Sequence, residues 1–180
     1  MKHAIQVFSL AGAIAVIAAP TFPAAQAPAS IKAEMLKDWS DLKATMVKIA
    51  NEMPAEKYAF KPTPAQQSFG DRVVHIAGVG NRFLGSVGGK TAAPALDAKA
   101  AAMTKEAAIK AMSDFFDYGT ALLNEQSDQT MMQTVMAPFI GASSRARVYT
   151  FLIGHTWDIY GQMAVYLRLS GGVPPASQRP

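Results

Sequence analysis

Cysteine is absent from the 180-residue sequence, and its absence excludes several kinds of chemistry. Without thiols the chain forms no disulfide, no thiolate metal site and no covalent cysteine intermediate. It also has no cysteine to carry the acyl chains of a lipoprotein anchor. Histidine is scarce too, with three residues in the whole chain, so candidate metal ligands and proton-transfer groups are few.

The sequence also lacks a strong excess of charge of either sign. It has 17 basic and 13 acidic residues, which gives a formal net charge of +4 at pH 7. This excess is small and scattered along the chain, so we expect no nucleic-acid partner. Half of the residues are hydrophobic, and 180 residues suffice for one domain with a sizeable core.

The first 29 residues have the features of a secretory signal peptide. Lys2 provides a positive start, residues 4–19 are almost entirely apolar, and small residues with an A-x-A pattern follow. The apolar run is short for a membrane span, and we expect cleavage after Ala29. The sequence therefore predicts a leader at 1–29 and a periplasmic or secreted domain at 30–180, without a stable membrane anchor. The alternative is an uncleaved N-terminal anchor.

The remaining chain reads as four amphipathic helices, because apolar residues recur every three or four positions. We expect the first helix from Ile31 to Met53, the second from Ser68, the third from Thr104 and the fourth from Ser143 or Ser144 to about Ser170. The fold class is therefore all-α, a four-helix bundle. Long connections at 54–67, 88–103 and 126–144 predict at least one crossover, and the last of these segments reads as irregular.

Common motifs for nucleotide binding and serine catalysis are not matched. The stretch GSVGGKT at 85–91 has one residue too few between its outer glycines for a phosphate-binding loop, and it ends a helix. No nucleophile-elbow motif accompanies the serines. We therefore expect neither a nucleotide site nor a serine hydrolase.

Two histidines, His75 and His155, lie in the second and fourth expected helices. Facing helices of a bundle often contribute metal ligands to its core. Ile159 occupies the position, one turn after His155, where a second histidine would complete an H-x-x-x-H pair, and Asp158 shares that side of the helix. The simpler interpretation is a pair of hydrogen-bonded core histidines.

Two long blocks of the sequence resemble the DinB-like (DinB/YfiT) superfamily, specifically its exported members. They are PAEKYAFKPTPAQQSFGDRVVHIAGVGNRF at 54–83 and HTWDIYGQMAVYLRLSGGVPPAS at 155–177. The resemblance implies a four-helix bundle in up-down-down-up order, often a homodimer. It also implies a divalent metal, commonly zinc or nickel, held by one histidine of the second helix and two of the last. Characterised relatives include thiol-dependent S-transferases and a maleylpyruvate isomerase.

Carried over by position, the resemblance gives His75 and His155 as two ligands, while the third falls on Ile159, which cannot bind metal. Asp158 is a possible replacement, giving a set of two histidines and one carboxylate that suits iron as well. The leading interpretation is a degenerate site in a small-molecule binding or interaction domain, with the ligand between the second and fourth helices. The alternative is a metal-dependent enzyme of S-transferase or hydrolase type that uses His75, His155 and Asp158 with zinc, nickel or iron. A third interpretation is a structural partner that acts through a dimer face.

Overall fold

The computed structural model describes residues 30–178, so the expected leader at 1–29 lies outside the described residues. Its long helices are α1 (Ile31–Glu52), α2 (Phe69–Val87), α4 (Lys105–Asn124) and α6 (Arg145–Leu169). The short elements are η1 (Ala55–Lys57), α3 (Ala98–Ala101), α5 (Asp128–Met131), β1 (Thr134–Ala137), β2 (Gly141–Ser144) and η2 (Pro175–Ser177). Within 30–178, no helix is both long enough and apolar enough to cross a membrane.

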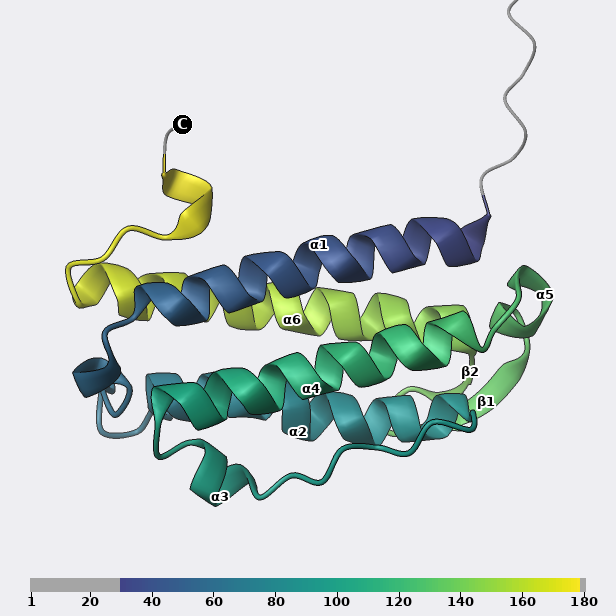
Figure 1. Cartoon of the computed structure of the whole chain (residues 1–180), viewed down its shortest axis with the longest axis horizontal. Coiled ribbons are helices and arrows are strands. Elements are labelled where there is room, and N and C mark those ends of the chain that lie inside the picture. The colour runs from purple at the N-terminus through teal and green to yellow at the C-terminus, as the bar shows by residue number, and fades with distance from the viewer. Residues whose placement is uncertain (1–29, 179–180) are drawn as a thin grey trace, which may run out of the picture.

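The four long helices form an up-down-down-up bundle (Figure 1). α1 and α6 run in one direction, α2 and α4 in the other, and the connection from α2 to α4 returns along the bundle. Both α2 and α1 pack against α4 and against α6. The predicted all-α bundle with a long crossover is therefore confirmed, and it creates a seam between α2 and α6.

Local hydrogen bonds set the helix starts, as the sequence predicts. The Ser68 hydroxyl accepts a bond from the Asp71 amide at 3.1 Å, and the Asp71 carboxylate accepts one from the Ser68 amide at 3.0 Å. This reciprocal pair is a capping box, which satisfies amides that have no partner inside the helix. The other long helices are capped by the side chains of Ser30, Thr104 and Ser144.

The centre of the core is an aromatic cluster around Trp39, which has no exposed surface. The rings of Phe115, Phe116 and Tyr149 contact the indole edge-to-face, with centroids 5.1–5.3 Å away. The indole N–H donates to the Phe116 carbonyl at 2.9 Å, so the one polar atom of the side chain is satisfied. The cluster ties α1 to α4 and α6.

Glycine lets α2 approach α4 closely at one position. A Cβ atom at Gly80 would lie 2.0 Å from the buried Phe115 ring, so any other residue would force the ring or the helices to shift. At Gly85 the same atom would meet nothing within 4 Å. The glycines of α2 therefore differ in role, and the close packing depends on Gly80.

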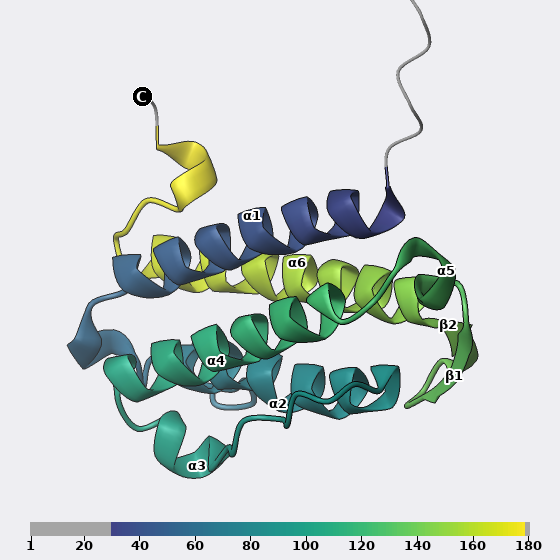
Figure 2. The ribbon, with the colours of Figure 1, turned by 45° about the vertical axis from the view of Figure 1, so that its right-hand side comes forward.

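The segment at 126–144 is more regular than the sequence pattern predicts. It contains α5 and an antiparallel hairpin in which β1 pairs with β2, at one end of the bundle (Figure 2). Phe139 and Gly141 adopt positive φ angles of 60° and 66° around the turn. The strands are four residues each and lack an alternation of apolar and polar residues, so the sequence pattern does not predict them. The expectation of an irregular segment was wrong at this point.

Candidate functional site

The structure brings the two predicted histidines together across the α2–α6 seam. The ring centroids of His75 and His155 are 5.3 Å apart, and their planes are inclined by 55°. Both side chains are half-buried. The sequence had placed them 80 positions apart, and the antiparallel packing of α2 on α6 makes them neighbours.

One imidazole nitrogen has no partner in the described part of the chain. His155 Nε2 is buried and makes no hydrogen bond to residues 30–178. The Phe151 ring lies parallel to His155 at 6.4 Å, and Phe83 stacks on Phe151 at 4.7 Å. Buried polar atoms are nearly always hydrogen-bonded, so an unpaired nitrogen in such apolar surroundings is available to a bound group.

The surroundings keep both imidazoles neutral. Burial lowers the pKa of His75, and repulsion lowers it further, because a protonated His75 would face Arg72 and any proton on His155. Burial also lowers the pKa of His155, although the Asp158 carboxylate opposes this shift. At pH 7 each ring therefore carries one N–H donor and one acceptor nitrogen.

We expect the stability of the metal-free protein to fall as the pH drops below about 6.5, the ordinary histidine value. The folded chain resists protonation of His75 and His155, whereas the unfolded chain takes up those protons, so acid favours unfolding. A double variant, His75→Gln with His155→Gln, should lose this part of the pH dependence. Urea unfolding with chelator present, between about pH 7.5 and pH 5, checks it. If the free energy of unfolding changed equally with pH in the wild type and the double variant, the expectation would be contradicted.

The third position of the expected metal site is apolar. Ile159 lies one turn after His155 and is 2% exposed. Asp158 is exposed, and its carboxylate accepts a hydrogen bond from Gln162 Nε2 at 2.9 Å. Across residues 30–178, no group of three or more His, Asp and Glu side chains is arranged to hold a metal ion. The donors present therefore do not fit a metal held by three protein ligands.

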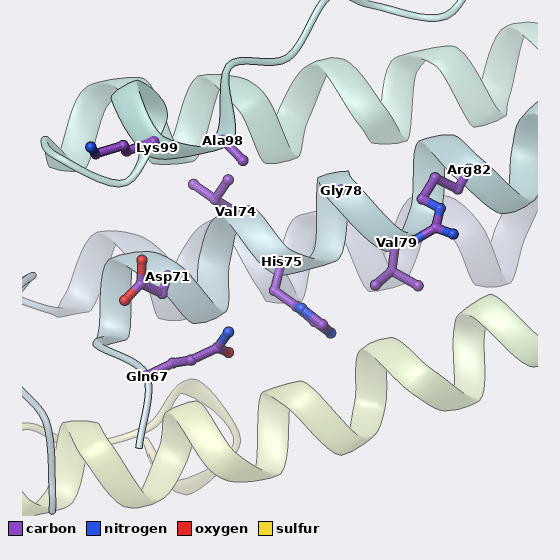
Figure 3. A pocket seen from close by; sticks show the side chains of 9 residues that line it. All are labelled: Gln67, Asp71, Val74, His75, Gly78, Val79, Arg82, Ala98 and Lys99. Atoms are coloured by element: carbon purple, nitrogen blue, oxygen red, sulfur yellow. The ribbon is translucent and has the colours of Figure 1, made fainter. Parts of the chain in front are cut away.

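A hollow of about 550 Å³ opens beside His75, between α2 and α3. In Figure 3 the His75 ring extends from α2 towards α6. Gln67, Arg82 and Lys99 contribute polar groups to the lining, and two valines of α2 contribute an apolar wall. Asp71 also borders the hollow, but its carboxylate is engaged in the capping box, which lowers its pKa.

Tyr160 and Gln162, which follow His155 on α6, differ in role. The Tyr160 hydroxyl accepts a hydrogen bond from the Ala176 amide at 3.2 Å, so it holds the C-terminal segment. Gln162 is half-buried and lines a second hollow in the seam. Arg72 lines the same hollow, and sequence reasoning missed it. The one sequence feature that could have indicated Arg72 is its position, one turn before His75 on the same helix.

The up-down-down-up bundle with two facing imidazoles belongs to a known class of helical proteins, as a family model shows. The sequence model described as the DinB superfamily matches residues 39–163. The chain belongs to the DinB superfamily.

A solved structure shares the fold. It is the crystal structure of a DinB-like protein from Bacillus cereus, 20% identical, with a TM-score of 0.57 over 78% of this chain and 93% of that one. The search of curated proteins gives no match. The likeness therefore extends to the architecture, and the function has to be argued from the site.

Proposed function

We propose that the chain is an exported DinB-like domain that binds a small organic molecule in the α2–α6 seam, beside His75 and His155. The observation that carries this proposal is the histidine pair itself. Two half-buried imidazoles face each other at 5.3 Å, and one buried nitrogen has no partner within residues 30–178. A concave site with a few convergent polar groups is the usual form of a ligand site.

The size and chemistry of the neighbouring hollow support a small molecule. Its volume of about 550 Å³ lies within the range of about 300–1,000 Å³ that is typical of ligand pockets. Neutral imidazoles offer both a donor and an acceptor, so they suit a polar group of a ligand. The valines of α2 suit an apolar part.

Export is part of the proposal, and it rests on the sequence. Residues 1–29 combine a basic start, an apolar stretch and small residues before Ser30, as secretory leaders do. Cysteine is absent, which is compatible with an oxidising compartment. A homodimer is an expectation from family resemblance, and sedimentation of the purified protein tests it.

A metal-dependent enzyme using His75, His155 and Asp158 is the second candidate. The unpaired His155 nitrogen and the neutral state of both rings favour it, because metals bind neutral imidazole. Against it, Asp158 is exposed and hydrogen-bonded to Gln162. Binding without a resident metal therefore agrees better with the donors present.

A fragment screen by NMR tests the proposal. We expect hits from a library of small organic fragments to perturb the ring resonances of His75 and His155. A His75→Phe variant keeps an aromatic ring of similar size and removes both nitrogens, so it should weaken these hits by about tenfold or more.

The control is a third hollow, between α1, α6 and η2, which is lined by Trp157 and Lys48. A Trp157→Ala variant should leave the same hits unchanged. Hits that depend on Trp157 and not on His75 would overturn the proposal. Stoichiometric metal in the wild type, lost in Asp158→Asn, would favour the enzyme instead.

A further inference from the structure

Arg72 is a cation without a partner in the seam. It lies on α2, one turn before His75, and is half-buried. Its Nε atom is buried and makes no hydrogen bond to residues 30–178. In the same part of the chain, the ion pairs are Lys37–Asp41, Lys43–Asp117 and Lys110–Asp114, so no carboxylate forms an ion pair with Arg72. The Arg72 charge acts on the neighbouring Asp71 carboxylate, which the capping box already holds.

A buried guanidinium nitrogen without a partner is costly, because water has been removed and nothing replaces it. Arg72 is also close enough to His75 to lower its pKa through its charge. The cost is offset if an anion binds there, since the guanidinium offers two parallel N–H groups that match the two oxygens of a carboxylate.

The hollow around Arg72 has the lining expected for such an anion. Its volume is about 220 Å³, roughly the space of seven water molecules at about 30 Å³ each. The lining consists of Pro62, Gln66, Arg72, Gln162, Val165 and Tyr166. None of these residues is acidic, and one full positive charge is present.

Neighbouring hydrogen bonds leave donors free in this hollow. The Tyr166 hydroxyl donates its single proton to the Gln67 carbonyl at 2.9 Å and lies 3.1 Å from Gln66 Oε1, so the Gln66 amide nitrogen is turned away from the hydroxyl. Gln162 donates to Asp158, which is the nearest acid on α6 and is exposed at the rim. Water therefore screens the charge of Asp158, whereas the buried Nε atom of Arg72 has no contact with water.

We infer that Arg72 binds the carboxylate of a small organic acid, whose remaining atoms face His75 and His155 in the seam. This inference rests on the proposed function and names its ligand class. A single guanidinium matches the single charge of a carboxylate better than the double charge of a phosphate ester. Pro62, Val165 and the Tyr166 ring supply the apolar contacts for the body of the acid.

Three matched probes test the inference: benzoate, its neutral amide benzamide, and phenyl phosphate. NMR titration of the purified protein follows backbone amides and histidine rings. We expect benzoate to bind with the lowest dissociation constant of the three. In Arg72→Gln its dissociation constant should rise by about tenfold or more, because a charge-assisted bond is lost. Arg72→Lys keeps the charge without the forked geometry and should restore part of the affinity.

The control variant is Arg147→Gln, which removes the same charge from an exposed position in the first turn of α6. It should change benzoate binding by less than about twofold. Three results would overturn the inference. They are equal benzoate affinity in Arg72→Gln and the wild type, benzamide or phenyl phosphate binding as tightly as benzoate, and no benzoate binding at about 10 mM.

The same titration separates the inference from the proposed function. If benzamide perturbs the His75 and His155 rings while Arg72→Gln leaves benzoate binding unchanged, the ligand site stands and its preference for acids fails. If benzoate binding depends on Arg72 and leaves both histidine rings unperturbed, the acid subsite stands and the proposed histidine site fails.

Discussion

Ile159→His is expected to lower the zinc dissociation constant of the protein by about 100-fold or more. The new imidazole would lie one turn after His155, whose Nε2 is buried and unpaired within residues 30–178 and whose ring lies 5.3 Å from that of His75. Three histidines are the protein ligands of a catalytic zinc site, whereas two hold the ion poorly. Competition against a fluorescent zinc chelator measures the change.

The substitution should also alter stability in two opposite ways. Position 159 is 2% exposed, so a polar ring there should destabilise the metal-free protein by about 1–3 kcal/mol. Zinc binds the folded state and should therefore raise the melting temperature of the variant more than that of the wild type. Thr150→His, which adds an imidazole at an exposed position of α6, is the control and should leave zinc affinity unchanged.

Two outcomes would count against this account of the site. Zinc affinity in Ile159→His equal to that of the wild type would mean that position 159 does not face the histidine pair. Tight stoichiometric zinc in the wild type, lost in Asp158→Asn, would mean that Asp158 is the third ligand.

Trp39→Ala is expected to lower the free energy of unfolding by about 3–5 kcal/mol. The side chain has no exposed surface, contacts three aromatic rings and donates a hydrogen bond to the Phe116 carbonyl. Its removal leaves a cavity between α1, α4 and α6. A domain with a typical stability of about 5–15 kcal/mol would lose a large share of it. Urea unfolding measures the change.

Trp157→Ala is the matched control, because the same residue type is 45% exposed there and contacts Tyr160 at its edge. We expect a loss of less than about 1 kcal/mol. Similar losses for the two tryptophans would contradict the placement of the core around Trp39.

Much of the fold could be predicted because its signals are local. A helical spacing of apolar residues and a capping side chain act within one or two turns, as at Ser68 and Asp71. The hairpin at 134–144 was missed, since its two short strands carry no apolar alternation and their pairing depends on contacts at the bundle end. The tertiary structure therefore decided that residues 134–144 form a hairpin.

The candidate site was predicted in part. His75 and His155 stand out because histidine is rare in this chain. Arg72 does not stand out, because it is one of 17 basic residues and most of these are solvated. Its burial without a partner is a property of the packed seam, and no sequence pattern reports it.

The sequence by itself determined four helices, with their starts to within one residue, a chain without thiol chemistry, and two histidines on two of the helices. Periodicity and capping are short-range effects, so they can be read along the chain. Only the tertiary structure decided that the two rings lie 5.3 Å apart, that Asp158 is held by Gln162, and that Arg72 has no partner within residues 30–178. These are distances between side chains of different turns or helices, and they are fixed by packing across the α2–α6 seam.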